Sequence, residues 1–317
     1  MRAYDRLLIK GLLVKCARVG LRGNVLTFIQ NFLTNRTFQV RIGKTASVTK
    51  KLQNGIPQGC IISPFLFNLM LYDIPTSPVV NSLLYADDYL LWKSGRNRKL
   101  IFNSAQTHLN TINKWFNSWG LNISEEKTVG ILFSRGSVKN NTLSVKLNGK
   151  VISIKDENKF LGLIFDKKLT WTPHINSIAV RCKQKINVLK SMASTRGFNR
   201  GSNLLLIYRA IIRSTLDYGC EAYDSACSST KNILDSIQYQ ALSICMGSLK
   251  GTSLNTLLVE SGEMPLDLRK MLARKLRILI NNDNEGTHPL SQSIKDCWQY
   301  HYTPAKSKHP LLDKEHS

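Results

Sequence analysis

Residues 83–92 read LLYADDYLLW, with two acids, Asp87 and Asp88, side by side inside an otherwise apolar run. Burying an unpaired carboxylate is costly, and successive side chains of a strand face opposite sides. A tight turn between two strands removes both difficulties, because both acids can then approach one site at the tip of a hairpin. The stretch therefore predicts a β-hairpin with carboxylates at its tip. A turn with solvated acids is the plainer alternative.

Carboxylate oxygens suit hard cations such as Mg²⁺, which is usually held by one or two carboxylates plus substrate phosphates. Two such ions can activate an attacking hydroxyl and stabilise the leaving oxygen in phosphoryl transfer. Asp87 and Asp88 are therefore candidate ligands of two Mg²⁺ ions, with Mn²⁺ as an alternative metal.

A second informative stretch lies about twenty residues upstream, where residues 54–68 read NGIPQGCIISPFLFN. Its two glycines and its proline predict a tight, exposed backbone that can approach a nucleotide or a template base closely. Gln58 offers both a donor and an acceptor, and Asn68 falls near the middle of an apolar helix predicted over 57–74. A glycine- and proline-rich turn before a core helix is the plainer interpretation.

The charge of the 317-residue chain points to a polyanionic partner. Lys and Arg number 44 against 21 Asp and Glu, a formal charge of +23. Such an excess is typical of proteins that bind nucleic acid, although a generally basic surface is an alternative. Basic residues cluster at 36–51, 93–99, 181–190 and 269–277; the last cluster is on a helix whose Leu268, Leu272, Leu276 and Leu279 we expect to face inward.

The cysteines and the hydropathy favour a soluble intracellular protein with no membrane partner. Seven cysteines, an odd number without a CxxC pair, argue against a zinc knuckle and a disulfide framework. No apolar run reaches the roughly 18 residues of a membrane span.

Element patterns predict an α+β part followed by a helical part. Apolar spacing predicts two helices within 6–33 and one over 100–119. Turn signals at 43–44 and 148–149 predict hairpins, and residues 160–166 read as one strand. Helices are predicted over 173–194, 202–216, 229–247 and 266–281. The predicted domains are therefore 1–170 and 171–282, with a polar tail over 283–317.

Together these stretches resemble the motifs of the reverse transcriptase family, specifically the non-LTR retrotransposon type. GIPQGCIISPFLFN (55–68) resembles motif B and YADD (85–88) resembles motif C. NISEEKTVGILF (122–133) resembles motif D, and KFLGLIFD (159–166) resembles motif E, the primer grip. In the helical half, residues 207–220, 237–247 and 259–270 look like the thumb of jockey-like elements.

The resemblance implies a right-hand polymerase palm, an antiparallel sheet with packed helices, followed by an all-α thumb, with the fingers mostly missing. It implies RNA-directed DNA synthesis with two Mg²⁺ ions on an RNA template and a DNA primer, from deoxynucleoside triphosphates. A monomer in the nucleus or cytoplasm, within a ribonucleoprotein, is expected.

The resemblance also implies roles for single residues. Asp87 is the main metal ligand and Asp88 assists, while Lys127 is a candidate general acid or simply a solvated lysine. Leu161 and Gly162 fall at the primer grip, or form only a packed β-turn. The implied contacts to nucleotide and template come from Tyr4 (as a steric gate against a ribose 2′-hydroxyl), Gln58, Gly59 and Asn68.

Motif A of the family supplies a further aspartate in a pattern like DxxxA[YF]D. Ala3-Tyr4-Asp5 aligns with its end, which places the metal-binding aspartate before Met1. We therefore expect this chain to be weak or inactive, either because the gene model starts late or because the element is a decayed copy. Two further hypotheses remain open: a nucleic-acid-binding remnant without chemistry, and a group II intron maturase-like RNA factor.

Overall fold

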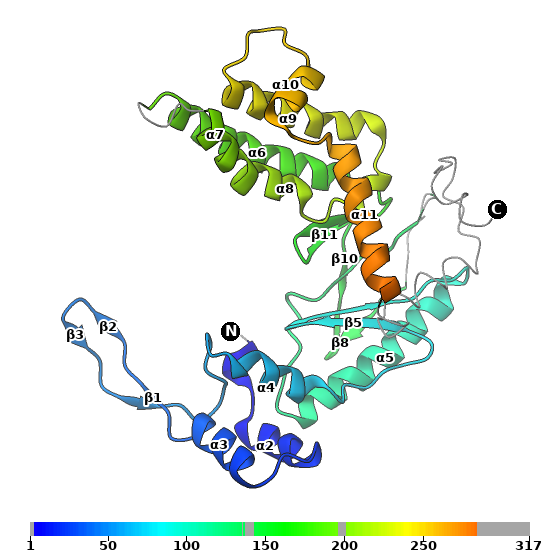
Figure 1. Ribbon diagram of the computed structural model, residues 1–317. Coiled ribbons are helices and arrows are strands. Elements are labelled where there is room, and N and C mark those ends of the chain that lie inside the picture. Colours follow the sequence, from blue (N-terminus) through cyan, green and yellow to red (C-terminus); the bar gives the residue numbers. More distant parts are fainter. Residues whose placement is uncertain (1–2, 135, 137–142, 196–200, 284–317) are drawn as a thin grey trace. The chain divides into compact units, whose positions relative to one another are not determined.

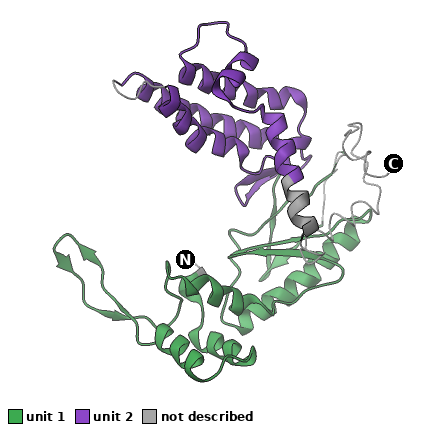
Figure 2. Cartoon of the chain, in the orientation of Figure 1, with its two compact units in different colours: residues 1–156 green, residues 157–317 purple. Residues whose placement is uncertain are grey.

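The computed structural model describes residues 3–134, 136, 143–195 and 201–283, and side chains of the last helix as far as residue 275. The chain divides into two compact units, residues 1–156 and 157–317 (Figure 2). The sequence places a change of character near residue 170. The division falls earlier because Leu163 and Phe165 pack against the core of the helices that follow them. The predicted tail lies outside the described residues, apart from its first residue.

Helices of the first unit follow the predicted apolar spacing. The two helices expected within 6–33 and the helix expected over 100–119 are confirmed. The helix predicted over 57–74 begins only at Ile62, because Gly59 is in the left-handed region (φ 86) that a helix does not tolerate. The helices are α1 (Ala3–Arg6), α2 (Ile9–Arg18), α3 (Gly23–Leu33), α4 (Ile62–Leu71) and α5 (Arg98–Ser118).

Strands of the first unit are short and pair two by two (Figure 1). Four pairs, β1–β4, β2–β3, β5–β6 and β8–β9, are antiparallel, whereas β7–β10 is parallel. The predicted mixture of helix and sheet is confirmed. The strands are β1 (Thr37–Phe38), β2 (Arg41–Ile42), β3 (Thr45–Ala46), β4 (Lys50–Lys51), β5 (Asn81–Tyr85), β6 (Asp88–Trp92), β7 (Val129–Gly130), β8 (Lys146–Leu147), β9 (Lys150–Val151) and β10 (Ser153–Ile154).

A buried lysine helps to join α2, α4 and α5. The side chain of Lys15 is fully buried, and its Nζ donates to the carbonyl of Met70 (2.5 Å) and to the carboxylate of Asp73. The same ammonium lies 4.4 and 4.2 Å from the ring centroids of Trp115 and Trp119. Burial lowers the pKa of Lys15, and the Asp73 carboxylate offsets part of that shift. The two tryptophans pack against the core of the first unit.

We expect Lys15→Met to destabilise the first unit by about 2 kcal/mol, because it removes a buried charge-assisted hydrogen bond and an ion pair while keeping most of the side-chain volume. Lys10→Met on the same helix is the matched control, since Lys10 is exposed. Denaturant unfolding followed by tryptophan fluorescence measures both. Equal stability of the two variants would contradict a structural role for Lys15.

The second unit is mostly helical, and the helices predicted over 173–194, 229–247 and 266–281 are confirmed. The single strand predicted over 160–166 is wrong, because Leu161 and Gly162 turn the chain between two paired strands. A helix at 254–261 was not predicted. The elements are β11 (Glu157–Phe160), β12 (Leu163–Asp166), α6 (Thr172–Ala193), α7 (Gly201–Ile207), the π-helical segment η1 (Tyr208–Arg213), α8 (Ser214–Asp217), the 3₁₀ segment η2 (Ala222–Ser225), α9 (Ser228–Met246), α10 (Leu254–Ser261) and α11 (Leu266–Asp283).

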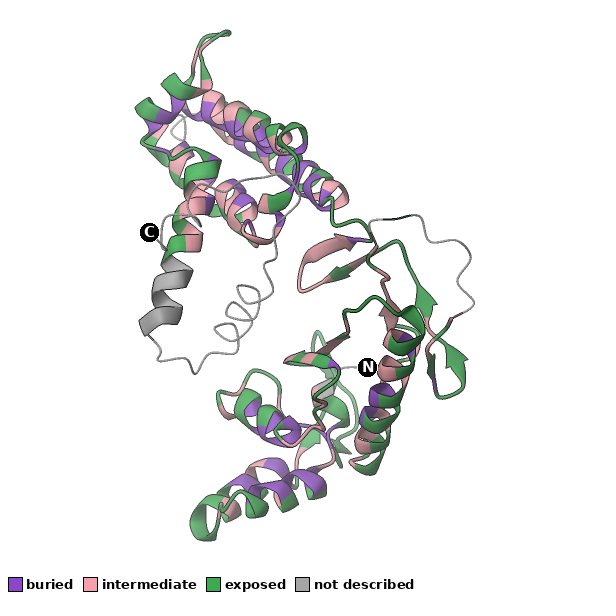
Figure 3. Cartoon of the chain, turned by 90° about the vertical axis from the view of Figure 1, so that its right-hand side faces the viewer, coloured by how far each residue is buried: buried purple, intermediate pink, exposed green. Residues whose placement is uncertain are grey.

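The prediction that Leu268 and Leu272 face inward on α11 is wrong, since both are about half exposed (48% and 47%). The helix instead buries Leu266 and Lys270, and the Lys270 ammonium lies 6.0 Å from the Tyr223 ring centroid. Burial along the chain is shown in Figure 3. Leu276 and Leu279, also predicted to face inward, lie beyond residue 275, where side chains are not described.

Two basic residues of the cluster predicted at 269–277 form ion pairs within the second unit. On α11, Arg269 binds Asp217 and Arg274 binds Asp224. Arg209 and Arg213 both pair with the buried carboxylate of Glu263, at 2.6 and 3.1 Å.

Among the described helices, none is both long and apolar enough to cross a membrane.

Candidate functional site

The YADD stretch forms the tip of the β5–β6 hairpin. Tyr85 pairs with Asp88, so Ala86 and Asp87 make a two-residue turn. Ala86 has φ 51, a left-handed conformation that is uncommon for a residue with a side chain. Asp87 and Asp88 are both exposed. The expected hairpin with acids at its tip is therefore present, but the flanking run is less buried than its composition predicts, since Leu83 is 45% exposed.

The register explains how the hairpin is held. Cross-strand partners share a face, so Leu84 and Tyr89 lie on one face, while Tyr85 and Asp88 lie on the other. On the first face, Leu84 packs against the core of the unit, and the Tyr89 hydroxyl shares a hydrogen bond with His108 Nε2 of α5 (3.1 Å). Burial lowers the pKa of His108 and raises that of Tyr89. A neutral pair thus anchors the hairpin and leaves its acidic face free of the core.

The motif B turn lies against the start of the chain. The Gly55 amide donates to the carbonyl of Leu7 (2.8 Å), and the Ile56 amide donates to the carbonyl of Tyr4 (2.9 Å). A Cβ at Gly55 would come 2.9 Å from the backbone oxygen of Asp5, so only glycine fits there. Gln58 Nε2 donates to Asp5 Oδ1 (3.2 Å). The structure therefore brings Tyr4, Asp5 and Gln58 together.

Arg36 holds the same turn from the other side. Its guanidinium donates to the carbonyl oxygens of Leu33 (Nε, 2.9 Å) and Gly55. Gly59, beyond the turn, is exposed with φ 86, and a Cβ there would meet nothing within 4 Å. Gln58 and Gly59 are thus presented to solvent by a braced backbone. No sequence pattern indicates that Arg36 braces this turn, because Gly55 lies 19 residues further along the chain.

Tyr4 and Asn68 lie on different helices, Tyr4 on α1 and Asn68 on α4. The Tyr4 ring stacks on Phe67, with centroids 4.6 Å apart and planes at 11°, which fixes the ring against a buried residue of α4. Asn68 lies on the exposed side of the same helix, in line with Ile61 and Phe65. A polar side chain between exposed apolar ones can contact a ligand without disturbing the core.

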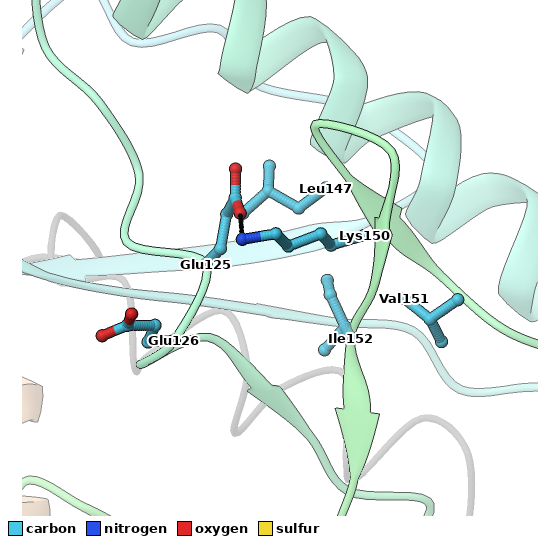
Figure 4. A pocket seen from close by; sticks show the side chains of 6 residues that line it. All are labelled: Glu125, Glu126, Leu147, Lys150, Val151 and Ile152. Carbon is cyan, nitrogen blue, oxygen red and sulfur yellow. Dashed lines mark ion pairs between the residues drawn. The ribbon is translucent and has the colours of Figure 1, made fainter.

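Lys127 is exposed, and among the described residues no hydrogen bond or ion pair joins it to Asp87 or Asp88. Its neighbour Glu125 pairs with Lys150 (2.8 Å) and accepts from Asn148 Nδ2 (2.9 Å). These two contacts lower the pKa of Glu125. Figure 4 shows the small pocket that Glu125 and Lys150 line with the β8–β9 hairpin; neither catalytic candidate aspartate lines it.

Leu161 and Gly162 form the two-residue turn of the β11–β12 hairpin in the second unit. Both have positive φ, 44 and 83. The Tyr218 hydroxyl donates to the carbonyl of Leu161 (2.7 Å), a contact that no sequence pattern indicates.

An exposed hairpin, here called the basic arm (residues 37–54), extends from the end of α3 (Figure 1). Every residue of the arm is exposed. Residues 47–49 stand opposite 39–40 between the pairs Phe38–Lys50 and Arg41–Ala46, which makes a β-bulge. From Arg6 to Tyr72 the chain contains ten Lys and Arg and no Asp or Glu. None of the four cations Arg41, Lys44, Lys50 and Lys51 forms an ion pair with a described residue.

The side chains at the hairpin tip supply the type of ligand that Mg²⁺ prefers, because their hard carboxylate oxygens are exposed and face away from the core. It does not by itself make a full coordination shell: within the described ranges, no group of three His, Cys, Asp or Glu is placed to hold a metal. Asp87 and Asp88 therefore suit an ion whose remaining ligands are water, substrate phosphate and a further carboxylate.

Comparison with known proteins gives a family match and several relatives. The family model described as reverse transcriptase (RNA-dependent DNA polymerase) matches residues 1–165. The RNA-directed DNA polymerase from mobile element jockey of Drosophila melanogaster is 27% identical over 249 residues, which cover 76% of this chain and 27% of the relative. A transposon BS protein of the same species is 26% identical over 270 residues, 80% of this chain and 29% of the relative.

A more distant relative is the retrovirus-related Pol polyprotein from type-1 retrotransposable element R1 of Bradysia coprophila, 24% identical over 233 residues. That match covers 72% of this chain and 23% of the relative. The chain thus spans about a quarter of the length of these relatives.

Proposed function

The chain belongs to the reverse transcriptase family, with relatives in non-LTR retrotransposons, and from that premise we propose that its first unit is part of an RNA-directed DNA polymerase site. The observation that carries the proposal is the β5–β6 hairpin, which is anchored through one face and presents Asp87 and Asp88 at an exposed tip. The first unit corresponds to a polymerase palm, and the helical second unit corresponds to a thumb.

In the proposed reaction the 3′-oxygen of a DNA primer bonds to the α-phosphorus of a deoxynucleoside triphosphate. The bond from that phosphorus to the bridging oxygen breaks, pyrophosphate leaves, and the hydroxyl proton passes to solvent. Mg²⁺ ions, when bound, would activate the hydroxyl and stabilise the leaving oxygen. Asp87 is the principal carboxylate toward these ions, and Asp88 assists.

The remaining site residues bind and orient. Gln58 and Gly59, on the braced turn, contact the incoming nucleotide and the template base, and Asn68 contacts the same ligands from α4. Lys127 is the candidate proton donor to pyrophosphate. In the second unit, the Leu161–Gly162 turn contacts the primer. The proposed macromolecular partners are an RNA template and a DNA primer, whose phosphates complement the basic arm.

Incorporation of labelled deoxynucleotides opposite an RNA template tests this function. We expect addition to follow the template sequence and to require Mg²⁺ or Mn²⁺. Incorporation that ignored the template would contradict the proposal.

A second candidate function is binding of nucleic acid without chemistry. It is favoured by the two-carboxylate tip, for which the described residues supply no third ligand. A protein of this kind would hold a template–primer through its cations whether or not a divalent metal is present.

Tyr4 is proposed to exclude ribonucleotides. Its ring is fixed by stacking on Phe67, so we expect Tyr4→Ala to raise the incorporation of ribonucleotides relative to deoxynucleotides by at least about tenfold, as removal of a steric block from a binding pocket can. Competition between the two nucleotide types measures the ratio. Tyr72→Ala, at an exposed ring beyond the end of α4, is the control and should leave the ratio unchanged; an unchanged ratio in Tyr4→Ala would contradict the assignment.

A further inference from the structure

The turn between β11 and β12 is conformationally unusual. Phe160 pairs with Leu163, so Leu161 and Gly162 are the two turn residues. Positive φ at both positions suits the right-handed twist of a hairpin, and such turns favour asparagine, aspartate or glycine. Leu161 at φ 44 is an outlier for a bulky residue. Conformations of this kind persist where surrounding structure holds them.

Tyr218 supplies that surrounding structure. Its hydroxyl donates to the Leu161 carbonyl at 2.7 Å, and its ring lies against the next residue. A Cβ added at Gly162 would come 2.9 Å from Cε1 of the Tyr218 ring. The turn and the tyrosine, 57 residues apart in the chain, therefore fit together only because position 162 is a glycine.

The tyrosine is itself held by the helices of the second unit. It directly follows α8, whose last residue, Asp217, accepts from Arg269 Nε of α11 (3.0 Å). The next residue, Gly219, has φ 66, and a Cβ there would come 2.6 Å from Leu163 Cδ2. A close Tyr-Gly contact thus ties the hairpin turn to α8, and through Asp217 to α11.

Tyr218 is 58% exposed, which makes it unlike the core tyrosines of this unit. Tyr208 and Tyr223 are fully buried. An exposed hydrogen bond contributes little to folding, because water can replace the lost partner. The contact therefore orients a surface turn more than it stabilises the unit.

We propose that Tyr218 is a positioning residue for the primer: it fixes the Leu161–Gly162 turn so that the turn meets the sugar-phosphate backbone at the primer's 3′ end in one orientation. This inference rests on the proposed function, in which that turn contacts the primer. Tyr218 acts through the turn and takes no part in the chemical step.

The test uses the whole chain, a template–primer with 2-aminopurine at the primer's 3′ end, and the variant Tyr218→Phe. The matched control is Tyr239→Phe on α9, whose hydroxyl has no hydrogen-bond partner among the residues that the structure describes. Three quantities are measured: the fluorescence change of the terminal base on binding, the Kd from the anisotropy of a distal label, and the midpoint of thermal unfolding.

We expect Tyr218→Phe to lose most of the fluorescence change and to slow nucleotide addition by about tenfold, because small misplacements of a reacting end are strongly felt. The Kd and the unfolding midpoint should match those of the control. Gly162→Ala should also lose the fluorescence change at the primer's 3′ end, although the Tyr218 hydroxyl is still present. The reason is that the added Cβ displaces the Tyr218 ring.

Three results would overturn the inference. A fluorescence change equal to that of the control would show that the hydroxyl does not orient the primer. If the unfolding midpoint of Tyr218→Phe fell by enough to explain the lost fluorescence change and the slower nucleotide addition, Tyr218 would have only a structural role. Failure of the unmodified chain to bind any template–primer would refute the proposed function as well. The first two results, in contrast, concern the Tyr218 variant and leave the proposed function standing.

Discussion

Asp87→Asn is expected to reduce the rate of metal-dependent nucleotide addition by at least about 10²-fold, the scale seen when one group that stabilises developing charge is removed. The substitution keeps the size of the side chain and removes only its charge. Because the tip is exposed and contributes no core contact, we expect the unfolding midpoint to stay the same. Single-turnover primer extension at a series of Mg²⁺ concentrations measures the effect.

Asp88→Asn should have a smaller effect, since Asp88 lies on the strand opposite Tyr85 and is proposed to assist the main ligand. Glu126→Gln, an exposed acid elsewhere in the same unit, is the control and should change nothing. If Asp87→Asn and Glu126→Gln behaved alike, the hairpin tip would be no more than a solvated turn.

Neutralising the basic arm is expected to weaken template–primer binding by about 10²-fold at moderate salt, because each phosphate contact carries a salt-dependent share of the affinity. The variant replaces Arg41, Lys44, Lys50 and Lys51 with glutamine. The slope of log Kd against log salt should fall by up to about 0.9 for each cation that contacts a phosphate. Filter binding or anisotropy between low and moderate salt measures both quantities.

The control for the arm keeps its charge and changes its side chains: Arg41→Lys together with Lys44→Arg, Lys50→Arg and Lys51→Arg. Binding should survive in this protein, since the electrostatic term depends on charge. Because every residue of the arm is exposed, neither variant should alter folding. Equal affinity of the neutral and the charge-keeping variants would show that the arm does not meet the nucleic acid.

Local patterns were sufficient to predict the parts of the molecule that depend on short-range rules. The hairpin around YADD, the arm around Gly43-Lys44 and the amphipathic helix α5 each carry their own periodicity and turn residues. For the same reason, the two acids could be placed at a hairpin tip before any tertiary contact was known.

The parts that could not be predicted depend on contacts between distant residues. The apolar run 160–166 reads as one strand, because nothing local marks Leu161 as a residue with positive φ; the Tyr218 hydroxyl that holds it comes from another element. Likewise, α11 leaves Leu268 half exposed and buries Leu266 and Lys270, the latter near the Tyr223 ring. The spacing of apolar residues in the sequence does not show which side of α11 packs against the core.

The motif B turn shows the same limit at the candidate site. Its glycines and proline predict an exposed, tight backbone; the structure exposes Gln58 and Gly59 but buries Gly55 and Ile56. Its bracing by Arg36 and by the backbone around Asp5 involves residues that lie far from the turn in the sequence. These bracing residues are structural partners of the proposed nucleotide-binding turn.

The most direct measurement is primer extension by the unmodified chain on an RNA template, with Mg²⁺ and with a chelator, alongside template–primer binding under both conditions. We expect slow, RNA-templated extension with Mg²⁺, none with the chelator, and binding in both. Template–primer binding with no extension at any Mg²⁺ or Mn²⁺ concentration would contradict the polymerase assignment for this chain and would leave a nucleic-acid-binding module.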